Sequence, residues 1–141
     1  MKRLKAIFFC STLLFLLSAC SESDSSQLEE KWQLSQMTGS ETDAALKNRV
    51  FFSFMKGTFM ATCITSSGNY EQYSGTYSLS GDALQITLLT NTTISTEFKH
   101  IMEWTDYSRT FKVVSLGDKT LTLQWNDSND SVSYTCRFRK Y

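Results

Sequence analysis

Apolar and polar side chains alternate along most of this chain with a period of two residues, which is the pattern of strands that bury one face. The pattern is clearest in 72–79 and 84–88, where tyrosine and leucine or isoleucine and leucine return at every second position. Gly81 and Asp82 lie between the two segments, and this residue pair is typical of a tight turn. The two segments are therefore predicted to form an antiparallel hairpin.

The same alternation recurs through the rest of the chain and predicts about eight strands joined mainly by short turns. The predicted strands are 31–37, 50–55, 59–64, 72–79, 84–88, 111–116, 120–125 and 132–138. Half-apolar strands in this order leave two sheet edges, and closure into a barrel covers them. The expected fold is all-β, a small antiparallel up-and-down barrel; an open β-sandwich is the alternative.

Two segments do not follow the alternation. Residues 39–48 are polar around a short apolar stretch, and we expect a short helix or a lid there. Residues 90–108 have no clear period, and 98–104 fits either a strand or a short helix. Loops of this kind often carry function, so both segments are candidate binding surfaces.

The N-terminus has a basic stretch followed by an apolar stretch over 6–17. That apolar stretch is shorter than the roughly 20 residues that a membrane-spanning helix needs, and it suits a secretory signal peptide. It ends in Leu17-Ser18-Ala19-Cys20, which resembles the lipobox of bacterial lipoproteins. The resemblance implies that 1–19 are cleaved, that a diacylglycerol is attached to the Cys20 thiol, and that its new amine is often acylated. An uncleaved or plain signal peptide is the alternative.

Residues 20–27 are rich in serine and acidic side chains, and cannot bury apolar surface, so we expect a lipidated flexible tether before a domain at 28–141. Ser21 stands where an aspartate would resemble an inner-membrane retention signal. Placement in the cell envelope, at the outer membrane and on an undetermined side of it, is therefore favoured.

Composition limits the classes of partner. The chain has a formal net charge of zero, and loss of the basic leader makes the remainder mildly acidic. No long basic run is present, which argues against a nucleic-acid partner. The length suits one domain with one core.

Two cysteines follow Cys20 in the sequence, Cys63 and Cys136, and both fall in predicted strands. An oxidising envelope permits a disulfide between them. Pairing also needs Cα atoms within about 7 Å, so two separate buried thiols are the alternative.

Several segments together resemble one family. They are a tryptophan at the start of the first strand (Trp32), the stretch from Gly75 to Ile86, the stretch from Leu116 to Leu123, and a final aromatic and basic strand that ends in Phe138-Arg139-Lys140. This order resembles the lipocalin-like domains common in Bacteroidetes lipoproteins. The resemblance implies an eight-stranded barrel with an internal site for a small hydrophobic molecule, and it implies no particular ligand.

Large aromatic side chains dominate one face of the predicted strands. They either pack as a core or line a ligand pocket. Small side chains at Ala61, Cys63 and Gly75 would leave room for a ligand. The candidate pocket residues are Trp32, Phe52, Phe54, Phe59, Tyr73, Tyr77, Trp125, Tyr134 and Phe138.

No catalytic constellation is recognisable. His100 is the single histidine, and with Glu103 it makes an incomplete metal site. His100, Asp106 and Ser108 could form a triad only if the fold brought them together. We therefore predict a protein that is not an enzyme, with no cofactor and no metal.

Two functions remain open. The first is a membrane-anchored envelope lipoprotein whose barrel binds a small hydrophobic or amphipathic molecule. The alternative is a protein–protein interaction or inhibitor module that uses the barrel loops or its outer face.

Overall fold

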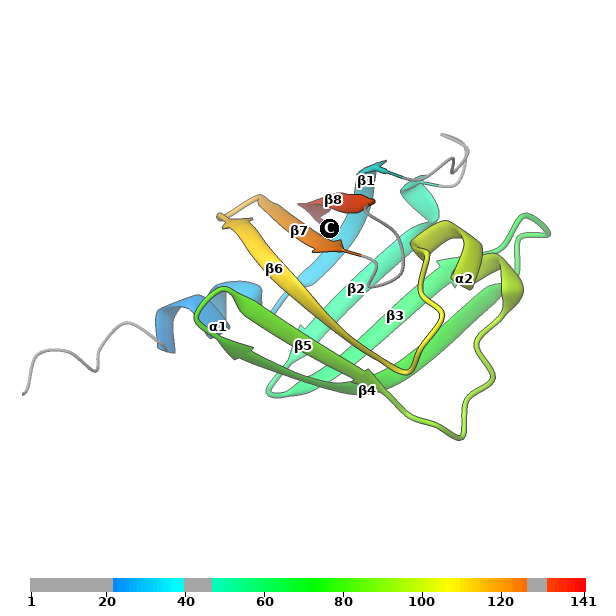
Figure 1. The fold of residues 1–141 in the computed structure, drawn as a ribbon, viewed down its shortest axis with the longest axis horizontal. Coiled ribbons are helices and arrows are strands. Elements are labelled where there is room, and N and C mark those ends of the chain that lie inside the picture. The colour runs from blue at the N-terminus through cyan, green and yellow to red at the C-terminus, as the bar shows by residue number, and fades with distance from the viewer. Residues whose placement is uncertain (1–21, 40–46, 127–131) are drawn as a thin grey trace, which may run out of the picture.

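The computed structural model describes residues 22–39, 47–126 and 132–141. It is a closed barrel of eight antiparallel strands in sequential order, as the alternation predicts (Figure 1). The predicted leader, Cys20 and residues 127–131 lie outside the described residues. The strands are β1 (Lys31–Thr38), β2 (Val50–Met55), β3 (Thr58–Ile64), β4 (Tyr70–Ser80), β5 (Ala83–Leu88), β6 (Ser108–Leu116), β7 (Thr120–Asn126) and β8 (Ser133–Lys140).

Local turn chemistry sets the register of the hairpins. Between β2 and β3, Lys56 and Gly57 both have positive φ, of 46° and 81°. Two such residues make the turn whose twist matches the strands that it joins. The turn places Met55 opposite Thr58 and Phe54 opposite Phe59, so both phenylalanines point inward.

Pairing of the first strand with the last closes the barrel, which decides against the open sandwich. Leu34 of β1 lies opposite Phe138 of β8, and both are buried. Beside this pair, Arg139 donates from Nε and Nη2 to Oε1 of Gln33 at 2.9 and 2.7 Å. Each strand is therefore paired on both sides over at least part of its length, which limits edge-to-edge aggregation.

A short helix, α1 (Glu22–Leu28), lies at one end of the barrel, so the prediction of a flexible tether over 20–27 is wrong for the described part (Figure 1). Leu28 is fully buried in the core, and its carbonyl accepts a hydrogen bond from Trp32 Nε1 at 3.0 Å. A tether prediction based on composition misses this because one apolar residue is enough to draw the last helical turn onto the barrel.

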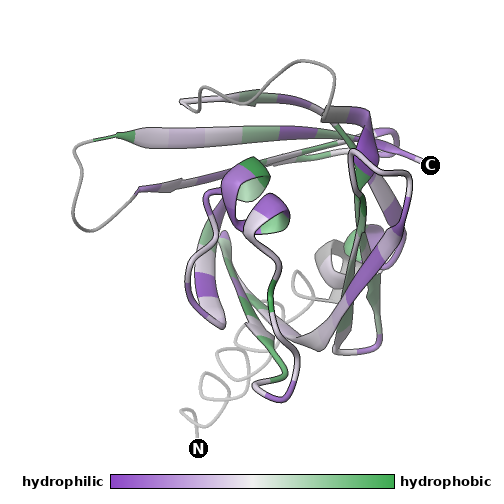
Figure 2. Ribbon diagram, turned by 90° about the vertical axis from the view of Figure 1, so that its right-hand side faces the viewer, coloured by the Kyte–Doolittle hydropathy of each residue, from purple (hydrophilic) through white to green (hydrophobic). Residues whose placement is uncertain are grey.

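A second short helix, α2 (Thr96–Met102), lies at the opposite end, across the opening (Figure 2). Ser95 caps its N-terminus by accepting a hydrogen bond from the Phe98 amide at 3.1 Å. Glu103 ends it in the left-handed conformation, at φ 46°. The ambiguous segment 98–104 is thus helical up to Met102, and Trp104 lies beyond the helix. No helix of the described residues is long and apolar enough to span a membrane.

The earlier polar segment, 39–48, is described only at its ends. A 3-10 turn, η1 (Lys47–Arg49), leads directly into β2. The part at 40–46, where a short helix or lid was expected, lies outside the described residues.

The two remaining cysteines are separate buried thiols, so the disulfide alternative is wrong. Cys63 lies on β3, opposite Val50 and Glu71, whereas Cys136 lies on β8, opposite Met37 and Leu123. Their strands are not neighbours in the barrel. The strand order and register therefore keep the two thiols on separate strands. The spacing of the two cysteines in the sequence could not reveal this.

Candidate functional site

The aromatic side chains proposed to line a pocket all contribute to the barrel interior. Eight of them are buried in one hydrophobic core, and Tyr77 is half-buried against it. They contact one another closely: the rings of Phe52 and Phe138 are 4.8 Å apart, and those of Phe54 and Tyr77 are 5.0 Å apart. The sequence therefore identified the interior face correctly. Whether these residues line a ligand site remains a prediction.

The centre of the interior is occupied by the segment that connects β5 to β6. Trp104, just beyond α2, is fully buried and lies within 6.3 Å of the rings of Phe52, Phe59, Phe98 and Phe111. The segment adds four further buried side chains, those of Ile94, Phe98, Ile101 and Met102. These side chains come from a connection and not from the strands. We call residues 94–104 the plug.

A polar cluster fastens the start of the plug to β4. The Tyr73 hydroxyl donates to Oε2 of Glu71 at 2.6 Å, and Ser95 Oγ donates to the same oxygen at 2.5 Å. The amide of Ser95 donates in turn to the Tyr73 hydroxyl at 3.2 Å. Burial and the bond to Glu71 raise the pKa of Tyr73, so its hydroxyl stays protonated.

Arg109 fastens the end of the plug, and the sequence analysis missed it. In the register of β5 with β6, Arg109 lies opposite Ile86, which is fully buried, so Arg109 is on the inward face. Its guanidinium lies 4.7 Å from the ring centroid of Trp125 and donates to the carbonyl of Met102 at 3.1 Å. It also donates to the carbonyl of Glu103.

The signal for Arg109 is present in the sequence. The alternation that places Phe111 inward extends two residues back to Arg109. The predicted strand began at Phe111, the first apolar residue of that alternation. Strand β6 in fact begins at Ser108, so the arginine lies within it.

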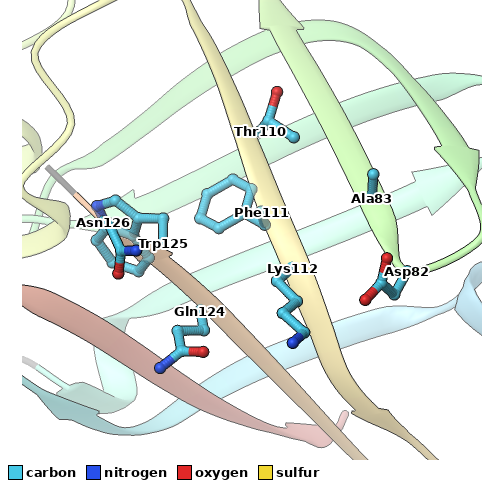
Figure 3. A pocket seen from close by; sticks show the side chains of 8 residues that line it. All are labelled: Asp82, Ala83, Thr110, Phe111, Lys112, Gln124, Trp125 and Asn126. Atoms are coloured by element: carbon cyan, nitrogen blue, oxygen red, sulfur yellow. The ribbon is translucent and has the colours of Figure 1, made fainter. Parts of the chain in front are cut away.

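Strands β6 and β7 separate near Arg109. Their pairing runs from Leu116 opposite Leu121 to Lys112 opposite Gln124, and the ladder ends there. A hollow of about 370 Å³ lies where the two strands part (Figure 3). Its walls are formed by Asp82, Ala83, Thr110, Phe111, Lys112, Gln124, Trp125 and Asn126.

This hollow lies on the outer surface and borders two side chains of the aromatic interior. Most of its residues are exposed or half-buried, but Phe111 and Trp125 are buried core residues with ring centroids 5.3 Å apart. Trp125 is also the one candidate pocket residue that borders the hollow. Arg109 lies over both rings, at 5.9 and 4.7 Å from their centroids.

A second hollow of about 250 Å³ lies on the outer face over β1 and β8. It is lined by Gln36, Thr38, Thr135 and Arg137, at the irregularity in the register between these strands. Its lining is polar and has no aromatic side chain. It offers mainly hydrogen bonds and little apolar contact area.

The candidate catalytic and metal residues do not assemble into a site. His100 and Ser108 are exposed, and Ser108 Oγ lies 3.2 Å from the hydroxyl of Thr87, in a contact between neighbouring strands. Within the described ranges, no group of three or more histidine, cysteine, aspartate or glutamate side chains could hold a metal ion.

The comparisons with known proteins agree with this geometry. A family model described as a lipocalin-like domain matches residues 15–141. The chain belongs to the lipocalin-like domain family. A lipocalin-like protein from Bacteroides uniformis has 30% identity and a TM-score of 0.67, and the match covers 82% of this chain and 99% of that one.

Two further solved structures place the lipocalin-like barrel in context. An uncharacterized protein from Bacteroides eggerthii has 33% identity and a TM-score of 0.61, over 79% of this chain and 98% of that one. Apocrustacyanin C1 shares the fold at 13% identity and a TM-score of 0.54, over 87% of this chain and 64% of that one. No curated protein shows a significant match. The fold is generally one that binds small hydrophobic ligands and not a catalytic one.

Proposed function

We propose that this lipocalin-like domain binds a small hydrophobic or amphipathic molecule inside the barrel. The observation that carries the proposal is the plug: the centre of the closed barrel is filled by Phe98, Ile101, Met102 and Trp104, which belong to no strand. Withdrawal of these side chains would open the interior and leave every strand pairing intact.

The energetics favour an apolar occupant. Burial of one large apolar side chain contributes roughly 1.5–3 kcal/mol, so an emptied interior would be costly. A ligand with a hydrocarbon portion would restore that burial, because the remaining walls are aromatic and apolar. The competition is therefore between the plug and the ligand for the same surface.

The test is capture of a ligand from a natural mixture. Residues 22–141, which contain the whole barrel and its core, would be incubated with an envelope lipid extract, repurified and analysed by native mass spectrometry. We expect a bound small molecule that organic solvent releases. A folded protein that stays at its bare mass would argue against the proposal.

A plug variant sharpens this test. Replacement of a buried Ile with Ala costs about 2–5 kcal/mol of stability. Ile101 is buried when the plug is inside the barrel, so Ile101→Ala would destabilise the closed arrangement relative to the open one. Ligand capture should therefore increase. Lys99→Ala, on the exposed face of the same helix, is the matched control and should capture as much as the unmodified domain.

We also propose that Cys20 carries a lipid anchor and that the protein resides in the cell envelope. Two residues span at most about 7 Å of chain, so the anchor would lie next to the start of α1. The α1 end of the barrel would then face the membrane and the plug would face away from it (Figure 1).

The anchor is tested by cysteine substitution. Cys20→Ser should abolish metabolic labelling with an alkyne fatty acid and release the protein from membranes. Cys10→Ser, within the proposed leader, should leave both unchanged. Outer-membrane placement would be tested with Ser21→Asp, which should move the protein to inner-membrane fractions.

A protein-interaction function is the second candidate. Leu89 is 49% exposed and Tyr107 is 38% exposed, and the amide of Leu88 donates to the Tyr107 carbonyl, so the two residues lie on backbone segments that are joined just before and just after the plug. If this surface binds a protein, Leu89→Glu should abolish its capture from solubilised membranes and leave ligand binding intact.

A further inference from the structure

The inward guanidinium of Arg109 is the least expected feature of the interior. Charged side chains are rarely found on the inward face of a small barrel, because removing a charge from water is costly. Arg109 is half-buried, on the inward face of β6, and lies within 6 Å of the ring centroids of Trp104, Phe111 and Trp125. Its charge therefore acts in an aromatic, low-dielectric environment.

That charge reaches deep into the core. Burial raises the pKa of the Cys136 thiol, and the positive charge of Arg109 opposes this rise. Cys136 is fully buried on β8, across the parted strands from β6. The positive charge of Arg109 therefore acts on groups inside the core and favours an anion there.

The contacts of Arg109 with the plug are exchangeable. Its acceptors there are the carbonyl oxygens of Met102 and Glu103, at the end of α2. A carboxylate or phosphate accepts two parallel hydrogen bonds from a guanidinium, and such charge-assisted bonds are roughly twice as strong as bonds to neutral acceptors. An anion that binds Arg109 would thus displace the end of the plug.

The plug also carries an unsatisfied polar group. Trp104 Nε1 is buried, and among the described residues it has no hydrogen-bond partner. A buried donor without an acceptor destabilises the arrangement that contains it. The closed arrangement of the plug is therefore destabilised by this N–H. An anionic group that entered the interior would give the N–H an acceptor.

We propose that the barrel interior selects single-chain anionic amphiphiles: Arg109 and Trp104 Nε1 bind the carboxylate or phosphate headgroup, and the hydrocarbon chain replaces the buried side chains of Phe98, Ile101 and Met102. The inference rests on the proposed ligand-binding function and adds to it the headgroup chemistry and the element that moves. The hollow between β6 and β7 is bordered by Phe111 and Trp125 (Figure 3), the two rings over which Arg109 lies, and the proposed ligand would enter there.

The experiment compares amphiphiles that share a tail and differ in the headgroup. Dodecanoate, dodecyl phosphate, dodecanol and dodecyltrimethylammonium would be titrated into residues 22–141 below their critical micelle concentrations, with binding followed by calorimetry. We expect at least one of the two anions to bind tenfold or more tightly than dodecanol, and the cation to bind most weakly. The two anionic arms distinguish a carboxylate from a phosphate ligand.

Variants assign the selectivity to Arg109. Arg109→Gln should remove the preference for the anion over dodecanol and keep the binding of dodecanol. Arg137→Gln, an exposed arginine on β8, is the matched control and should keep the preference. Arg109→Lys retains the positive charge but cannot make the bidentate hydrogen bonds of a guanidinium, so the preference for the anion over dodecanol should fall several-fold. This variant answers the question if Arg109→Gln does not fold.

Hydrogen exchange reports on the plug. Binding of the anion should speed exchange of the amides from Phe98 to Trp104 and leave the β3 and β4 amides protected. If the anions and dodecanol bind equally, or if Arg109→Gln keeps the preference, the headgroup inference is overturned and the general ligand-binding function stands. If none of the four amphiphiles binds, the inference is also overturned, and capture from lipid extract then tests the general function separately.

Discussion

At the residue scale, Gly75 allows β4 and β5 to approach each other closely. A Cβ atom at this position would lie 2.2 Å from the carbonyl oxygen of Thr87 and 3.0 Å from Cα of Leu88. The backbone of β5 therefore occupies the space that a side chain at position 75 would need. The expectation that Gly75 leaves room for a ligand is wrong for this reason.

Gly75→Ala should consequently destabilise the barrel. The backbone of β5 would have to move, and overpacking of this kind typically costs about 1–3 kcal/mol. The free energy of unfolding, measured by urea denaturation, should fall by that amount. Gly117→Ala is the control, because the nearest atoms to its Cβ are 3.9 Å away. Equal stabilities of the two variants would contradict the account.

The two buried thiols give a prediction about reactivity. Burial, with the negative charges of Glu71 and Glu97, raises the pKa of Cys63 to about 11, and burial raises that of Cys136 to about 12. The thiolate is the reactive form. At pH 8 neither thiol of residues 22–141 should react with a thiol reagent until the protein is unfolded. Two should then react without a reductant.

The same shifts predict a loss of stability in alkali. In the unfolded chain both thiols ionise near their ordinary pKa of 9.0, whereas the folded state keeps them protonated. The free energy of unfolding should therefore fall as pH rises above 9. The double variant Cys63→Ala and Cys136→Ala should lose less stability between pH 9 and pH 10. Above pH 10, Tyr73 and Tyr77, whose pKa values are also raised, add to the loss.

At the scale of the element, α2 is held by a few contacts at its ends. Glu71, Tyr73 and Ser95 hold the start, and Arg109 holds the end. A helix of this length is not stable alone, so its conformation depends on these contacts and on its buried face. It should be the first element to open.

Tyr73→Phe tests this view. The ring of Tyr73 lies 4.5 Å from that of Phe98, and this contact would be kept, while the hydroxyl that joins Glu71 to Ser95 would be lost. Removal of such a bond costs about 0.5–1.5 kcal/mol. Amides of 96–102 should exchange several-fold faster.

The control is Tyr70→Phe, on the same strand, where the side chain is 73% exposed. It should leave exchange unchanged. Uniformly faster exchange over every strand in Tyr73→Phe would show that the hydroxyl stabilises the whole barrel and not α2.

The elements differ in how well the sequence predicts them. Strands β4 and β5 could be predicted closely, because their alternation and the turn between them are local. For α2, local pattern was ambiguous, since Phe98, Ile101 and Met102 are buried together only once the barrel surrounds them. α1 was mistaken for a tether because a single buried residue, Leu28, holds it.

At the scale of the whole molecule, stability depends on closure. Strand β8 pairs with both β1 and β7 and carries buried Tyr134, Cys136 and Phe138. Removal of 133–141 would leave two unpaired edges and an exposed aromatic interior.

We expect the chain truncated before 133 to lack a cooperative thermal transition in near-ultraviolet circular dichroism. Removal of Tyr141 alone, which loses its ring contact with Phe51 and one backbone bond to Lys31, should keep the transition. A cooperative transition in the longer truncation would mean that seven strands suffice.

The strands and their inward faces could be predicted from the sequence, because alternation and turn residues act between near neighbours in the chain. The family could be recognised from the resemblance of several segments. Contacts between distant residues settle the rest. Pairing of β1 with β8 closes the barrel, register separates Cys63 from Cys136, and the plug enters the interior. The role proposed for Arg109 depends on the fold in the same way. Its partners come from α2, β6 and β7, and only folding brings these elements together.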